Sequence, residues 1–164
     1  MKFNEDSRVK IPTILHLIKL GYEYISLKNY KWDTETNIFP DIFNKKIKEI
    51  NPNLTNDEIK QYYRDLSLTL ENEDLGKVFY EKLISQSGIK LIDFKNFENN
   101  AFNVVTELTY KKDDEEFRPD ITILINGIPL IFIEVKKPNN RDGIQAEYKR
   151  VKSRFKNKKF RNFI

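Results

Sequence analysis

The sequence predicts an α/β (α+β) domain in which helices flank a central mixed β-sheet of about four to five strands. The first half of the chain carries apolar residues at helical spacing, and after Gly88 the pattern changes to the short apolar runs typical of strands. A length of 164 residues suits one substantial hydrophobic core. We therefore expect a single domain over residues 1–164.

The helices are predicted by periodicity and by end signals. Ile11, Ile14 and Ile18 recur at helical spacing, and the pattern stops at Gly21, which predicts an amphipathic helix ending in a glycine. A capping box that begins at Thr55 marks the start of a later helix. The expected helices span about residues 7–20, 40–50, 56–71, 74–86 and 141–156.

Alternating or continuous apolar runs predict the strands. The expected strands span residues 22–27, 89–94, 103–110, 120–125 and 130–136. The last two flank Asn126-Gly127, a dipeptide typical of hairpin turns. Both faces of these two runs are apolar, so we expect central strands that are covered on both sides.

Three charged residues lie at the open ends of the last two strands. Asp120 begins the first strand, and Glu134 and Lys136 end the second. A charge at the margin of a buried sheet is costly unless it is paired or coordinates a metal. The placement therefore indicates a functional site, with a structural ion-pair network as the alternative.

The pairing register decides whether these side chains can meet. Glu134 and Lys136 share a face because side chains alternate along a strand. Asp120 joins them only if it pairs with residue 134, whereas a strict two-residue turn would pair it with residue 133. We therefore predict a three-residue loop over 126–128 with a positive φ at Gly127, or else a bulge in one strand.

The residue types limit the chemistry. Cysteine is absent and His16, which we expect to be structural, is the only histidine, so thiol nucleophiles, Ser-His-Asp triads and most zinc sites are excluded. Asp120 and Glu134, with the backbone carbonyl oxygen of Val135, would instead hold Mg²⁺. In the hydrolysis of a phosphodiester bond, Lys136 would orient or deprotonate the attacking water, or stabilise the transition state.

Positive charge is concentrated near the C-terminal end. Residues 149–161 hold eight Lys or Arg and no acid, although the net charge of the chain is only +4. Clustered cations favour polyanions through counterion release, and a solvated helix face is the alternative. The expected contacts to DNA phosphates are made by Lys149, Arg150, Lys152 and Arg154.

At the same residues the sequence resembles a known family. Residues 118–137, RPDITILINGIPLIFIEVKK, are similar to a signature of the N-terminal nuclease domain of the restriction (R) subunit of type I restriction-modification enzymes. Residues 20–26, LGYEYIS, resemble an early segment of that family, and residues 136–147 resemble its continuation. The resemblance implies a restriction-endonuclease-like PD-(D/E)xK core. The family's catalytic positions fall on Asp120, Glu134 and Lys136.

The resemblance also implies an activity and partners. It implies a Mg²⁺-dependent endonuclease domain, part of a type I site-specific deoxyribonuclease, in a fragment of a longer R subunit whose ATP-using motor domains are absent here. That subunit would act on DNA in the cytoplasm with methyltransferase (M) and specificity (S) subunits. The isolated fragment can be inactive, because the missing motor would deliver the DNA. The sequence contains no apolar stretch long enough to span a membrane.

Further supporting residues are expected near the site. Related nucleases carry a Gln-xxx-Tyr motif, but Gln145 and Tyr148 are only three residues apart, so that motif is not reproduced. Glu5 is the acid nearest to the first helix. Glu107, on the strand before Asp120, could face the metal or be an ordinary surface glutamate.

Two other functions fit the same fold. One is a non-catalytic module that docks DNA or assembles the complex, and the other is a stand-alone PD-(D/E)xK repair nuclease. The intact set of Asp120, Glu134 and Lys136 argues against the first. The type I signature argues against the second.

Overall fold

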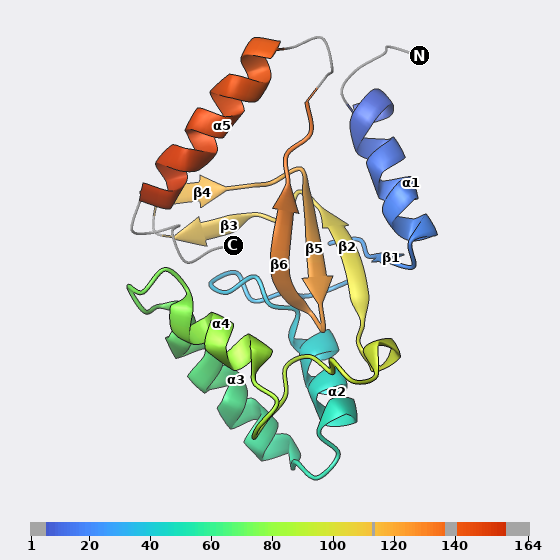
Figure 1. Cartoon of the computed structure of the whole chain (residues 1–164), viewed down its shortest axis with the longest axis vertical. Helices are drawn as coiled ribbons and strands as arrows, with labels where there is room; N and C mark the ends of the chain where they lie inside the picture. The colour runs from blue at the N-terminus through green and yellow to red at the C-terminus, as the bar shows by residue number, and fades with distance from the viewer. Residues whose placement is uncertain (1–5, 113, 137–140, 157–164) are drawn as a thin grey trace.

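The computed structural model describes residues 6–112, 114–136 and 141–156 (Figure 1). Within these residues a four-stranded sheet has the order β1-β2-β5-β6. Its strands are β1 (Glu23–Tyr24), β2 (Phe102–Thr106), β5 (Ile121–Ile125) and β6 (Ile128–Ile133). β1 runs parallel to β2 and the other neighbours are antiparallel, so the sheet is mixed. The predicted fold class, a mixed central sheet flanked by helices, is confirmed.

The predicted helices are all present, with small shifts at their ends. A π-helical turn (Asp6–Lys10) leads into α1, and α3 begins with the predicted capping box, in which Thr55 Oγ1 accepts from Glu58 N and Thr55 N donates to the Glu58 carboxylate. The helices are α1 (Ile11–Lys19), α2 (Pro40–Ile50), α3 (Asn56–Leu70), α4 (Lys77–Ile84) and α5 (Arg141–Lys156).

The face of α1 that packs on the sheet differs from the one that its apolar pattern predicts. Leu17 is buried and Ile14 is partly buried against one face of the sheet, where Ile121 and Ile123 of β5 lie. The large side chains of Ile11, Leu15 and Ile18 are exposed. Helical periodicity therefore located the helix, but it did not identify which part of the apolar stripe would be covered.

The predicted strand at 89–94 is wrong, although Leu91 and Ile92 are buried. Amide side chains bond the backbone of this segment in place of a neighbouring strand. Asn51 Oδ1 accepts from Lys90 N at 2.9 Å, and Asn126 Nδ2 donates to Leu91 O at 2.8 Å. An apolar run bonded in this way satisfies its polar backbone groups without belonging to a sheet.

The predicted strand at 103–110 is interrupted at Glu107, whose φ is +57°. β2 ends before this residue, and the chain continues into a separate two-stranded sheet that the sequence did not predict. This small sheet pairs β3 (Tyr110–Lys112) with β4 (Glu115–Phe117). It carries the chain from one end of β2 to the start of β5.

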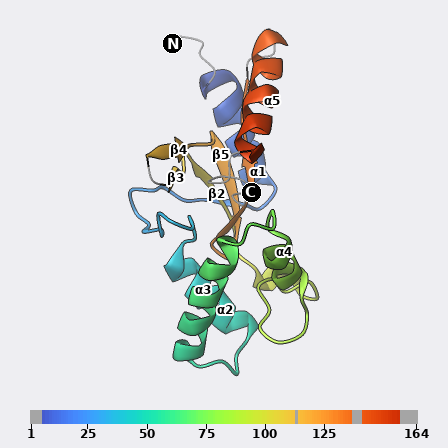
Figure 2. The ribbon, with the colours of Figure 1, turned by 90° about the vertical axis from the view of Figure 1, so that its left-hand side faces the viewer.

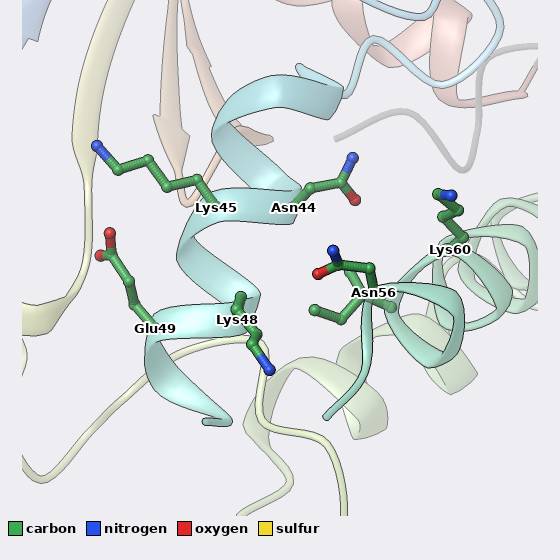
Figure 3. A pocket seen from close by; sticks show the side chains of 7 residues that line it. Asn44, Lys45, Lys48, Glu49, Asn56 and Lys60 are labelled. Carbon is green, nitrogen blue, oxygen red and sulfur yellow. The ribbon is translucent and has the colours of Figure 1, made fainter. Parts of the chain in front are cut away.

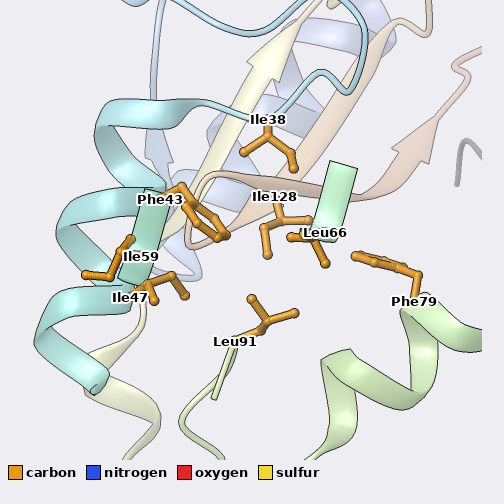
Figure 4. Packing of buried hydrophobic residues seen from close by; sticks show 8 residues of the cluster. All are labelled: Ile38, Phe43, Ile47, Ile59, Leu66, Phe79, Leu91 and Ile128. Atoms are coloured by element: carbon orange, nitrogen blue, oxygen red, sulfur yellow. The ribbon is translucent and has the colours of Figure 1, made fainter. Parts of the chain in front are cut away.

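Helices α2, α3 and α4 form a layer beyond the turn of the β5–β6 hairpin, whereas α1 and α5 lie at the other end of the sheet (Figures 1 and 2). The core of this layer is shown in Figure 4 and includes one residue of β6, Ile128. Phe43, Ile47 and Leu66 are fully buried within it. The layer therefore anchors one end of the hairpin and leaves the other end free for a site.

Candidate functional site

The β5–β6 hairpin has the register that a shared site requires. Ile125 pairs with Ile128, so the turn contains only Asn126 and Gly127, and the predicted three-residue loop is wrong. The alternative of a bulge is confirmed, because the pairing shifts after Leu124–Pro129 and leaves one residue of β6 unpaired. Beyond the bulge Ile121 pairs with Ile133, and the next residues along the two strands are Asp120 and Glu134.

The turn itself is fixed to the helical layer. Asn126 and Gly127 have φ values of +53° and +79°, which suit a two-residue turn with two left-handed residues. Gly127 O accepts from Phe39 N at 2.9 Å, at the start of α2. A Cβ atom on Gly127 would lie 2.8 Å from Phe39 O and 3.0 Å from Phe43 N. Glycine is therefore required both by the backbone conformation and by the close helix.

β6 is an edge strand of the described sheet, so the expectation that both hairpin strands are central is wrong for β6. Its residue Ile131 is 49% exposed. β5 lies between β2 and β6 and is buried over most of its length. Because no further strand of the described residues covers the free edge of β6, helix α5 can contact the residues at the end of this strand.

The carboxyl groups of Asp120 and Glu134 converge on the face of the sheet opposite to α1. Asp120 Oδ2 accepts from Val135 N at 2.9 Å, which fixes the aspartate against the end of β6. Burial raises the pKa of Glu134 to about 7, and the charges of Asp120 and Glu147 and a hydrogen bond with Asp120 add to the rise. The Glu134 side chain is only 9% exposed, and its Oε1 atom is buried without a hydrogen-bond partner.

Lys136 and α5 complete the polar cluster. Lys136 Nζ lies 3.5 Å from Glu147 Oε2, and Arg150 Nε donates to Glu147 Oε1 at 2.7 Å. Glu147 therefore bridges the lysine at the end of β6 to an arginine of its own helix. The Glu147 side chain is 13% exposed, so this bridge is shielded from water on most sides.

Two guanidinium groups of α5 face Glu134. Arg150 Nη2 lies 3.7 Å from Glu134 Oε2, and Arg154 Nη1 lies 3.8 Å from Glu134 Oε1. Arg154 Nη1 is buried and, like the Glu134 Oε1 atom it faces, has no hydrogen-bond partner in the described residues. The Arg154 guanidinium lies 4.0 Å from the centre of the Phe117 ring, a cation–π contact. Burial lowers the pKa of Arg154, and the neighbouring charge of Arg150 adds to this effect.

The formal charges of this cluster balance. Its described members are three acids and three bases, and each ion pair among them joins α5 to the end of β6 or lies within α5. The cluster consists of Asp120, Glu134, Glu147, Lys136, Arg150 and Arg154.

The donor set fits a hard divalent cation. Asp120 and Glu134 bring two carboxylates together, and Val135 follows directly with a backbone carbonyl oxygen. The buried, unpartnered Glu134 Oε1 is an acceptor that a cation would satisfy. Among the described residues no group of three or more His, Cys, Asp or Glu side chains is arranged to hold a metal, so an ion here would complete its coordination with the carbonyl and with water.

Glu107, one of the possible supporting residues, is occupied by a different partner. Its carboxylate accepts from Lys10 Nζ at 2.7 Å, and this hydrogen bond lowers the pKa of Glu107. Its backbone N donates to Asp120 O at 3.3 Å, so Glu107 contacts the aspartate through its backbone. Glu5 lies outside the described residues. His16, expected to be structural, is exposed on α1.

The remaining predicted residues divide into two groups along α5. Gln145, Tyr148, Lys149 and Lys152 are exposed. Arg150 and Arg154, which were also predicted as contacts to DNA, make the ion pairs with Glu134. Whether any of these residues contacts DNA stays a prediction.

The sequence interpretation missed Glu147 and Phe117. Glu147 lies three residues before Arg150, a spacing that favours an ion pair on a helix and could have marked it. No local signal pointed to the contact of Phe117 with Arg154, because it joins β4 to α5.

A separate hollow of about 500 Å³ lies between α2 and α3, far from this cluster (Figure 3). Two of its lysines already serve the helix ends, since Lys48 Nζ donates to Pro52 O at 3.1 Å and Lys60 Nζ lies 3.5 Å from Asp57. The described lining of the hollow includes three lysines but only one acid, Glu49, so it lacks the paired carboxylates found beside β6. In the part of the chain that the structure describes, no helix is both long enough and apolar enough to cross a bilayer.

Comparisons with known proteins identify relatives of this chain. The chain is 32% identical over 180 residues to the type I restriction enzyme MjaIXP endonuclease subunit of Methanocaldococcus jannaschii, a match that covers 94% of the chain and 17% of that relative. It is 40% identical over 95 residues to the MjaVIIIP endonuclease subunit of the same organism, covering 57% of the chain and 8% of the relative. It is 24% identical to the HindI endonuclease subunit of Haemophilus influenzae, covering 82% of the chain and 15% of the relative.

The chain thus spans less than a fifth of the length of each of these three relatives. No solved structure matches it significantly. The family model for the type I restriction enzyme R protein N terminus matches residues 2–164, nearly the whole chain. The chain therefore belongs to the family of type I restriction enzyme R protein N-terminal domains.

Proposed function

We propose that this chain is the Mg²⁺-dependent DNA endonuclease domain of a type I restriction enzyme R subunit, with Asp120, Glu134 and Lys136 as its catalytic residues. The observation that carries the proposal is the meeting of two carboxyl groups at the end of the β5–β6 hairpin, where Glu134 keeps a buried oxygen without a partner. Two carboxylates in such a place are costly unless they have a ligand. Membership of the restriction family supports DNA as the substrate.

Asp120 and Glu134, with the backbone carbonyl oxygen of Val135, would hold the cation. Mg²⁺ prefers oxygen ligands and retains several waters, which suits a site with few protein donors. When bound, it would stabilise the negative charge that builds on the phosphate oxygens. The side chain of Val135 is buried in the core beneath the sheet, so its backbone is held firmly beside the two carboxylates.

Lys136 would act on the attacking water. Its ammonium lies on the same face as the two carboxylates and is held by Glu147 at 3.5 Å, so it is oriented before substrate arrives. From this position the ammonium would orient the water and stabilise the charged transition state, and only after losing its own proton would the amine accept one from the water. Attack by the water on phosphorus breaks one P–O ester bond of the DNA backbone, and the leaving oxygen takes up a proton.

The rest of the enzyme would supply the DNA and the specificity. Lys149 and Lys152 are exposed on α5 and would contact the phosphate backbone, which positions DNA without reading its sequence. ATP-driven translocation would be performed by parts of the R subunit outside this chain. Recognition of the DNA sequence would come from the specificity subunit, in a complex that also contains the methyltransferase subunit.

The test uses the complete R subunit assembled with the M and S subunits in the presence of ATP and Mg²⁺. Asp120→Ala and Lys136→Ala should each abolish DNA cleavage while ATP-driven translocation continues. Asp142→Ala and Lys60→Ala remove the same charges at exposed positions of α5 and α3 and should cleave as the wild type does. Wild-type cleavage by Asp120→Ala would show instead a non-catalytic docking module. Cleavage by the R subunit without M and S would favour a stand-alone nuclease.

A further inference from the structure

The ion pairs of α5 raise a question about how a cation enters this site. Arg150 and Arg154 of α5 approach Glu134 at 3.7 and 3.8 Å, and each faces a different carboxylate oxygen. The Glu134 side chain is only 9% exposed, and both guanidiniums are directed at this carboxylate, on which cation binding would depend.

The geometry of these contacts is that of counterions rather than of fixed hydrogen bonds. Neither distance from Glu134 is within hydrogen-bond range, and both Glu134 Oε1 and Arg154 Nη1 remain buried and unpartnered. Arg154 is held in place by other means, through its stacking on the Phe117 ring. Arg150 is held by its hydrogen bond to Glu147. The two positive charges are thus positioned by α5 and β4 and not by Glu134 itself.

A divalent cation would change the charge balance of the cluster. The described cluster holds three acids and three bases, so its formal charges balance without a metal ion. A divalent cation entering between Asp120 and Glu134 would add two positive charges beside two fixed guanidiniums, and like charges at such distances repel. The cation and the docked arginines therefore compete for the same carboxylate.

We propose that Arg150 and Arg154 act as built-in counterions of Glu134, which compete with the divalent cation and keep its affinity low while α5 is docked. The inference rests on the proposed function, because it assumes that Asp120 and Glu134 hold the cation. It assigns the two arginines a role in controlling metal uptake, in addition to any contact with DNA. A bound phosphate, which is negatively charged, would relieve the repulsion between the arginines and the cation.

Cation affinity measured on the 164-residue chain without DNA tests the proposal. Isothermal titration with Mn²⁺ should show binding that is tighter by a factor on the order of ten in the Arg150→Gln/Arg154→Gln double variant than in the wild type. Arg150→Lys/Arg154→Lys keeps both charges and should stay near the wild-type affinity. Arg64→Gln and Lys156→Gln remove exposed charges on α3 and α5 and should change the affinity less than twofold.

Cation binding and the docking of α5 are coupled, and such coupling is reciprocal. Cation binding should therefore also weaken the docking of α5. Saturating Mn²⁺ should accelerate hydrogen exchange of the α5 amides in the wild type. The same addition should change exchange in α5 of the double variant far less. Amides of α3, which lies in the helical layer at the other end of the sheet, should be unaffected in both proteins.

The outcomes separate this inference from the proposed function. Equal Mn²⁺ affinity in the double variant and the wild type, or weaker affinity in the variant, overturns the competition while leaving the metal site intact. Slower exchange of α5 in Mn²⁺ also overturns it. If neither protein binds Mn²⁺, or if Asp120→Asn binds it as well as the wild type, the metal site itself is refuted and the inference falls with it.

Discussion

Replacing Glu134 by glutamine should make the metal-free domain more stable at neutral and alkaline pH. Burial, the nearby charges of Asp120 and Glu147, and the hydrogen bond with Asp120 together raise the pKa of Glu134 from 4.5 to about 7 in the folded chain. The folded chain therefore holds this proton more tightly than the unfolded chain does. Glutamine has nearly the same shape and stays neutral, so Glu134→Gln removes the cost of ionising this buried group.

The magnitude follows from the size of the rise in pKa. One pKa unit corresponds to 1.36 kcal/mol, so the rise amounts to about 3 kcal/mol. Because the folded-state pKa is raised, this contribution to stability is fully present below about pH 4.5 and is lost as the pH rises to about 7. The free energy of unfolding of the wild type should therefore fall by about 3 kcal/mol relative to Glu134→Gln between about pH 4.5 and pH 8.

Urea unfolding in EDTA at a series of pH values measures this difference. Trp32, the only tryptophan, stacks on the buried Phe39 with ring centres 6.2 Å apart, and its fluorescence should report unfolding. Comparing each variant with the wild type at the same pH cancels the titration of the other groups. Glu81→Gln, at an exposed position of α4, serves as the matched control and should show a difference that does not depend on pH.

A difference between wild type and Glu134→Gln that stays constant with pH would refute the reasoning. So would a wild type that gains stability relative to the variant as the pH rises. Either result would mean that the arginines of α5 compensate the ionised carboxylate fully, and that Glu134 carries no ionisation cost for a cation to relieve.

Three further predictions concern the site and the elements that hold it. Mg²⁺ at ten times its dissociation constant should stabilise the wild type by about 1.4 kcal/mol in thermal unfolding and should not stabilise Asp120→Asn. Gly127→Ala should lower the free energy of unfolding by about 2–4 kcal/mol, because a Cβ atom would lie 2.8 Å from Phe39 O at a φ of +79°; an unchanged urea midpoint would contradict this role of the turn. Phe43→Ala should lower the free energy of unfolding by about 3–5 kcal/mol, since Phe43 is fully buried in the helical layer. Tyr80→Ala, at a 58% exposed position, should lower it far less.

The helices and the hairpin could be predicted from the sequence because their signals are local. The capping box at Thr55 joins residues three apart, and the structure shows both of its hydrogen bonds. The register argument was also local: alternation along a strand requires an extra residue if Asp120 is to face Glu134. The extra residue is present, but as a bulge in β6 rather than in the turn. The sequence could not distinguish a three-residue loop from a bulge, because either one places Asp120 on the same face as Glu134.

The errors arose where distant segments decided the outcome. Residues 89–94 have the apolar pattern of a strand, yet their backbone groups are bonded by side chains such as Asn51 and Asn126 from other segments. The apolar stripe predicted for α1 is mostly exposed, as at Ile11 and Ile18, whereas Leu17, which lies outside that stripe, is buried against the sheet. Periodicity reports which residues could be buried, and only the packing partner determines which of them are.

The sequence by itself determined the position of Asp120, Glu134 and Lys136 at one end of a hairpin, because strand periodicity and turn chemistry act over a few residues. Only the tertiary structure decided which charges surround them. Arg150 and Arg154 were predicted as contacts to DNA, and only the docking of α5 places them beside Glu134. The pKa of Glu134 is raised by burial and by Asp120 beside it, and the further charges of Glu147 and Arg150 come from a separate helix whose placement no local pattern encodes.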